Sequence, residues 1–105
     1  MTQEKNIVPK DEPTIMSIRG IEITIDPQVF DDWKVLELLY LLDPPDDTDA
    51  KPLAIIPLAK RILGNQYRYV INALENKKTG RNPIEEMTDF VKKIIEGVSP
   101  NSSRS

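Results

Sequence analysis

The sequence contains no cysteine and no histidine among its 105 residues. Without cysteine the chain forms no disulfide and no thiolate metal site, which is typical of a protein of a reducing cytoplasm. The same absences exclude histidine-dependent serine triads, cysteine nucleophiles and zinc sites, and they remove the side chains that titrate most readily near neutrality. Composition therefore predicts that the protein is not an enzyme and that it folds without a metal or cofactor.

Long hydrophobic runs are also missing. The longest apolar block, Leu38 to Leu42, is far shorter than the ~20 residues that span a bilayer. The first 13 residues are polar and include five charged side chains, unlike a secretory signal. We therefore expect a soluble protein with no membrane partner. Its length predicts one domain with a modest core over residues 14–97, between flexible tails at 1–13 and 98–105.

Charge of each sign is concentrated in one half of the chain. Residues 1–50 carry 4 basic and 12 acidic side chains, a net charge of −8, whereas residues 51–105 carry 10 basic and 5 acidic ones, a net charge of +5. In one interpretation the halves attract each other within a single fold. In the other, copies of the chain associate head to tail into a homo-oligomer, or the basic half receives an acidic partner.

The order of the patterns predicts a mainly α fold, a small bundle of about four helices with a short N-terminal β-hairpin. Alternating apolar side chains predict strands at about 15–18 and 21–25, joined by a turn at Arg19-Gly20. An isolated hairpin is marginally stable in water, so its isoleucine face is expected to lie on the helices.

Two helical segments are predicted next. Asp26-Pro27 starts the first, because the carboxylate can accept from a free amide and proline lacks the N–H that a first turn leaves unpaired. This segment runs to about Leu42 with a break near Asp31, and prolines 44 and 45 end it before an acidic loop at 43–50. The second runs from about Pro52 to Leu63, with Gly64 at its end. Because of Pro57, either the helix starts near that residue or residues 53–56 form a separate turn.

A third helix is predicted from a cap at Asn65 to about Glu75, followed by an exposed loop at 76–81. The last helix is predicted to begin with a capping box of Asn82 and Glu85 around Pro83 and to end at Gly97. Its expected buried stripe, with Phe90 beside it, consists of Ile84, Met87, Val91, Ile94 and Ile95.

The acidic loop is the densest cluster of carboxylates, formed by Asp43, Asp46, Asp47 and Asp49. An EF-hand loop that began at Asp43 would need glycine at its sixth position and glutamate at its twelfth, where this chain has Thr48 and Ala54. We therefore interpret the cluster as a solvated loop rather than a metal site.

Residues 53–75 could be taken for a DNA-binding helix-turn-helix, with a secondary basic surface of Lys60, Arg61 and Arg68. The presumed recognition helix, however, carries only one basic residue in its first two turns, and the chain is net acidic. Nucleic acid is thus not the favoured partner. The alternative function is a small adaptor or a DNA-associated regulator of a mobile element.

The segment from Trp33 to Leu42 is apolar almost all round, which is typical of a helix that is buried on all sides or that meets a partner. One stripe, the expected core face, consists of Val35, Leu38, Leu39 and Leu42. The other consists of Trp33, Leu36 and Tyr40, and it includes residue types enriched at binding hot spots. The second stripe is therefore the candidate partner-binding site.

The succession of these segments resembles the small tail assembly chaperones of long-tailed bacteriophages and prophages. The segments that carry the resemblance are Asp31-Asp32-Trp33 before a leucine-rich helix, the junction from Leu63 to Tyr67, and Gly80-Arg81-Asn82-Pro83 before the last helix. The resemblance covers about residues 21–96.

The resemblance implies a protein of the bacterial host cytoplasm that is absent from the finished virion. It implies binding to the hydrophobic tape measure protein, which is kept soluble until tail tube protein polymerises around it. Many members of that family also have a longer form, made by ribosomal frameshifting, that adds a C-terminal domain. Exposed apolar surface on helix 33–42, beside the acidic loop, would suit such a role.

Overall fold

The computed structural model describes residues 12–98, and it begins with the predicted hairpin. Strands β1 (Thr14–Ile18) and β2 (Ile21–Ile25) are antiparallel, with Ile18 opposite Ile21. Arg19 and Gly20 both have positive φ, as the tightest hairpin turns require. The predicted tails at 1–13 and 98–105 lie almost entirely outside the described residues.

The helical segment after the hairpin is divided near Asp31, which confirms the predicted break. A 3-10 helix, η2 (Pro27–Phe30), follows Asp26, whose carboxylate accepts from the Gln28 N–H at 3.0 Å. Asp32 then caps α1 (Trp33–Leu42) by accepting from the Lys34 N–H at 2.9 Å. The two aspartates thus start two successive helices, because each satisfies an amide that its helix leaves unpaired.

The middle of the chain is one unbroken but bent helical stretch. It consists of η3 (Pro52–Ala54), α2 (Ile55–Leu63), η4 (Gly64–Gln66) and α3 (Tyr67–Leu74). Pro57 lies in the first turn of α2, where its missing N–H removes no helical hydrogen bond. The bend is at Gly64, which has a φ of +57°.

Asn65 does not cap α3, contrary to the sequence prediction. It lies inside η4, and the Tyr67 N–H at the start of α3 already donates to the Gly64 carbonyl. The neighbouring Gln66 side chain holds this junction to the hairpin instead. Its Oε1 accepts from the Thr24 N–H at 2.9 Å and its Nε2 donates to the Thr24 carbonyl at 2.7 Å. An amide side chain thus takes the place of a neighbouring strand at the outer edge of β2.

The last helix, α4 (Ile84–Val98), begins one residue later than predicted. Asn82 is therefore not its cap, and its side-chain Nδ2 donates to the Ile71 carbonyl at 2.7 Å. Gly97 lies within α4 and does not end it. A Cβ at this position would lie 2.6 Å from the terminal methyl carbon of Met16 in β1, so close approach of the strand explains the glycine.

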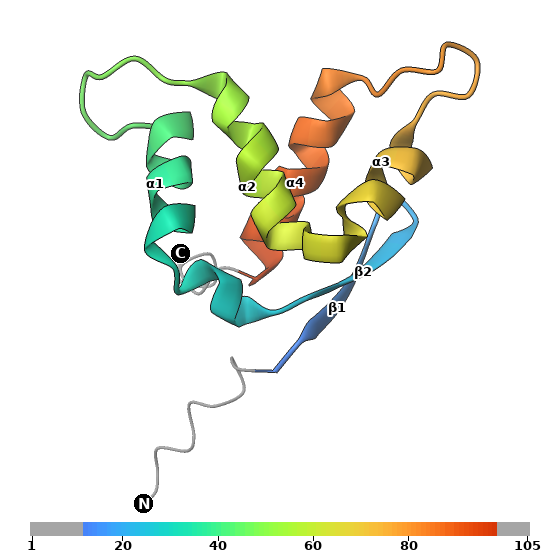
Figure 1. The fold of residues 1–105 in the computed structure, drawn as a ribbon, viewed down its shortest axis with the longest axis horizontal. Coiled ribbons are helices and arrows are strands. Elements are labelled where there is room, and N and C mark those ends of the chain that lie inside the picture. The colour runs from blue at the N-terminus through green and yellow to red at the C-terminus, as the bar shows by residue number, and fades with distance from the viewer. Residues whose placement is uncertain (1–11, 99–105) are drawn as a thin grey trace, which may run out of the picture.

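One core joins the hairpin to the helices (Figure 1). Phe90 of α4, which the sequence placed beside the buried stripe, is fully buried. Ile84 was predicted in that stripe but is 80% exposed, because it begins the helix at the end of the molecule. The fully enclosed side chains of the core are Ile23, Ile25, Val35, Leu58, Leu63, Val70, Phe90, Val91 and Ile94.

The fold is mainly helical with an N-terminal hairpin, as predicted, but the helices are not four separate units. Apart from η2, the helical residues of the described chain fall into three stretches, at 33–42, 52–74 and 84–98. The number is lower because no extended residue separates α2 from α3. Within residues 12–98, no helix has the length and apolarity needed to cross a membrane.

Candidate protein-binding surface

One side of α1 is apolar and exposed. Trp33, Leu36 and Tyr40 are 75%, 50% and 41% exposed, and we call these three residues the outer face. On the opposite side Val35 is fully buried, and three leucines are partly buried against the core at positions 38, 39 and 42. Helix α1 is therefore not enclosed on all sides, and its two stripes lie in different environments.

The outer face is linked to the acidic loop through Tyr40. The Tyr40 hydroxyl donates to Oδ2 of Asp46 at 2.9 Å, and Oδ1 of Asp46 accepts from the Thr48 N–H at 3.0 Å. Hydrogen bonding by Thr48, first through its side chain and then its amide, together with the Tyr40 hydroxyl, lowers the pKa of Asp46. This bond ties the Tyr40 side chain to the acidic loop.

A groove lies beside the outer face, between α1 and α2. It has a volume of about 520 Å³, and its lining combines apolar and charged side chains. The lining residues are Lys34, Glu37, Leu38, Tyr40, Leu41, Pro57 and Arg61. Sequence reasoning missed Leu41 and Pro57 as surface candidates, because only the packing of α2 against α1 brings them together. Tyr40 belongs both to the outer face and to this groove.

The structure divides the predicted basic surface. Arg61 pairs with Asp32 at the start of α1, with Nη1 and Oδ2 3.4 Å apart. Lys60 and Arg68 instead lie over the Tyr67 ring, at 5.6 Å and 5.8 Å from its centroid. The three cations therefore have two different sets of neighbours.

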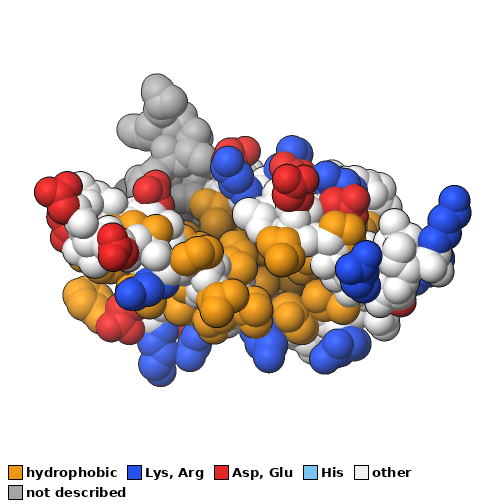
Figure 2. Space-filling model, turned by 90° about the horizontal axis from the view of Figure 1, so that it is seen from above, with side chains coloured by type: hydrophobic (Ala, Val, Ile, Leu, Met, Phe, Trp, Pro, Cys, Tyr) orange, Lys and Arg blue, Asp and Glu red, His pale blue; other side chains and the backbone are white. Residues whose placement is uncertain are grey.

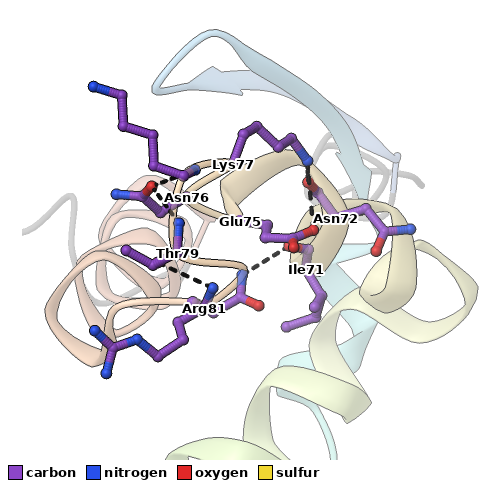
Figure 3. A network of polar contacts seen from close by, with 9 residues as sticks. Ile71, Asn72, Glu75, Asn76, Lys77, Thr79 and Arg81 are labelled. Atoms are coloured by element: carbon purple, nitrogen blue, oxygen red, sulfur yellow. Dashed lines mark hydrogen bonds and ion pairs between the residues drawn. The ribbon is translucent and has the colours of Figure 1, made fainter.

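The predicted loop at 76–81 is exposed but has a defined shape (Figure 3). The Asn76 N–H donates to the Arg81 carbonyl at 2.8 Å, and the Asn76 side chain accepts from the Lys78 N–H at 2.9 Å. Lys77 reaches back to the Asn72 carbonyl at 2.9 Å. These bonds fix the backbone from which the loop's basic side chains extend.

The carboxylates do not assemble into a metal site within residues 12–98, where no group of three or more metal-ligating side chains is suitably placed. Asp46 is used by Tyr40 and Thr48, as described above. The features around α1 are thus an exposed apolar stripe and a groove whose lining combines apolar and charged side chains.

No family model, curated protein or solved structure matches the chain.

Proposed function

We propose that this protein is a tail assembly chaperone of a bacteriophage or prophage, and that its outer face binds an apolar segment of the tape measure protein. The observation that carries the proposal is the 75% exposure of Trp33 on a helix whose other side enters the core. A large aromatic side chain left in water gains apolar contact when a partner covers it.

The spacing of the outer face suits a helical partner. Trp33, Leu36 and Tyr40 stand at i, i+3 and i+7, which places them along one side of two helical turns, or about 10 Å. This is the pattern by which an amphipathic helix meets an apolar groove or a second helix. The acidic loop beside Tyr40 would keep such a surface hydrated when no partner is bound.

The proposal places the protein in the cytoplasm of the bacterial host. Its partners there would be the tape measure protein and, during assembly, a longer frameshifted form of the chain and the tail tube protein. The alternative, a small adaptor or DNA-associated regulator, would use Lys60, Arg61 and Arg68. We favour it less, because Arg61 is paired with Asp32 and the other two cations flank Tyr67.

The test is to look for a tape measure gene near this one, to co-express its product with this chain, and to follow with co-purification and titration. The double variant Trp33→Ala, Leu36→Ala should fold normally and lose about 2 kcal/mol or more of binding free energy. Tyr69→Ala is the matched control, because Tyr69 of α3 is also 50% exposed but lies outside the outer face. Unchanged binding by the double variant would contradict the proposed site.

Absence of any tape measure gene nearby, together with salt-sensitive binding to duplex DNA, would support the alternative instead.

A further inference from the structure

A second apolar surface lies at the end of the molecule where α2 and α4 begin (Figure 1). Leu53 of η3, Ile56 of α2 and Ile84 of α4 are 77%, 47% and 80% exposed, and we call them the apolar end. Figure 2 looks onto this end and shows hydrophobic side chains gathered in a band across its middle. This surface belongs to different elements from the outer face of α1.

Two loops of opposite charge border the apolar end. The acidic loop, residues 43–50, contains four aspartates and no basic residue, whereas the basic loop, residues 76–81, contains two lysines and an arginine and no acidic residue. In Figure 1 the acidic loop stands at the upper left and the basic loop at the upper right. The surface thus has a negative edge, an apolar middle and a positive edge.

Several of these charges lack a partner of opposite sign within residues 12–98. The ion pairs of this region do not include Asp47, Asp49, Lys78 or Arg81. Both loops are nevertheless held in shape before association. The Lys51 N–H donates to the Leu41 carbonyl at 2.7 Å at the end of the acidic loop, and the Asn76–Arg81 bridge closes the basic loop. Pre-ordered loops reduce the conformational entropy that binding must overcome.

A surface of this kind is complementary to itself. A second copy can be placed face to face with the first by a twofold axis that lies in the contact plane and is perpendicular to the line joining the two loops. In this arrangement each acidic loop faces the basic loop of the other copy. The apolar bands then meet in the middle. Such an isologous contact closes at two copies, unlike a head-to-tail contact that continues into rings or filaments.

We propose that the apolar end is a homodimer interface, formed by two copies face to face with the acidic loop of each against the basic loop of the other. This proposal is independent of the outer face and of the proposed chaperone function. The two surfaces adjoin at Tyr40, which donates to Asp46 of the acidic loop, whereas Trp33 lies at the opposite end of α1.

The experiment is sedimentation velocity on the full chain across a range of concentrations. The wild type should show a monomer–dimer equilibrium with no larger species, and dissociation should increase with added salt, which screens the exposed charges. Two charge-reversal variants, Lys78→Glu with Arg81→Glu and Asp47→Lys with Asp49→Lys, should each raise the dimer dissociation constant by about tenfold or more. Mixing these two variants should restore a closed dimer, because the unaltered acidic loop of the first then faces the unaltered basic loop of the second, and the introduced glutamates face the introduced lysines.

Further variants separate the surfaces. Leu53→Ser with Ile84→Ser should also raise the dissociation constant by about tenfold, and both residues are exposed, so circular dichroism should show an unchanged fold. Lys92→Glu, a reversal on the exposed middle of α4, should leave the dimer intact. The proposal is overturned by a chain that is monomeric at every concentration, by oligomers that grow beyond two copies, or by failure of the mixed variants to pair. It is also overturned if Trp33→Ala with Leu36→Ala dissociates the dimer, since the outer face would then be the interface.

Discussion

At the residue scale, Asp46 shows how a surface carboxylate organises its surroundings. It accepts from the Thr48 amide on one oxygen and from the Tyr40 hydroxyl on the other. The Thr48 side chain contributes most, and with these two donors it favours the charged form and lowers the pKa of Asp46 below its ordinary value. The residue therefore links the candidate outer face to the acidic loop.

This arrangement predicts a dependence on pH. A carboxyl whose pKa is lower in the folded than in the unfolded state stabilises the fold above the unfolded value, about 3.9 for aspartate, and this contribution is lost as the pH falls through the folded value. Titration followed by NMR should show Asp46 protonating below the range of an ordinary aspartate. Tyr40→Phe, which removes the hydroxyl and keeps the ring, should raise the Asp46 pKa towards the ordinary value. An unchanged Asp46 titration in this variant would contradict the assigned bond.

At the scale of the element, α1 shows how a helix that is apolar almost all round divides into a buried and an exposed stripe. Neighbouring residues along this helix point in different directions, so the fully buried Val35 is followed directly by Leu36, which is 50% exposed. Burial of one stripe on the side of α1 that meets α2, η3 and η2 leaves the other in solvent. The division comes from helical geometry, since residues of one stripe recur at intervals of three and four.

The two neighbours should therefore respond differently to the same substitution. Val35→Ala should lower the free energy of unfolding by about 2 kcal/mol, because it leaves a cavity in a closed core. Leu36→Ala should change it by less than about 0.5 kcal/mol, as expected for an exposed site. Urea denaturation followed by circular dichroism measures both. Equal losses would mean that Leu36 belongs to the core and that the outer face is misassigned.

At the scale of the whole molecule, the hairpin and the helices depend on one core. Ile23 and Ile25 of β2 are as deeply buried as Phe90 of α4. A two-stranded hairpin is not stable by itself, so it should not unfold separately from the helices that cover it.

Cooperative unfolding tests this dependence. Ile23→Ala should lower the free energy of unfolding by about 2–5 kcal/mol. The variant should still unfold in a single transition when the helical circular dichroism signal at about 222 nm is followed. Hydrogen exchange should show the hairpin and α4 opening together. A variant in which the hairpin exchanges freely while α4 stays protected would show that the core is divided.

The separation of charge along the chain also acts at this scale. Within residues 12–98, two exposed ion pairs join the halves, Arg19 with Asp89 at 3.3 Å and Arg61 with Asp32 at 3.4 Å. Exposed pairs contribute little to stability. Among the described residues, the ion pairs leave out Asp47 and Asp49 of the acidic loop and Lys78 and Arg81 of the basic loop.

Much of the fold follows from signals between residues close in sequence. The strand alternation, the helix starts at Asp26 and the break near Asp31 were all predicted, because a cap, a proline or a strand face depends on atoms a few residues away. The two stripes of α1 could be separated for the same reason. These features depend on local interactions and not on contacts between distant parts of the chain.

Other features were decided only by tertiary packing. Gly97 resembles a helix end in sequence, yet it provides room for Met16 of a strand some 80 residues earlier. Asn82 resembles a cap, yet it donates to the carbonyl of Ile71. Ile84 fits a buried stripe by spacing, but the end of the helix projects beyond the core. The acidic and basic loops share one end of the molecule because α2 and α4 both begin there. Spacing determines which side chains share a face, whereas burial depends on what the rest of the chain places against that face.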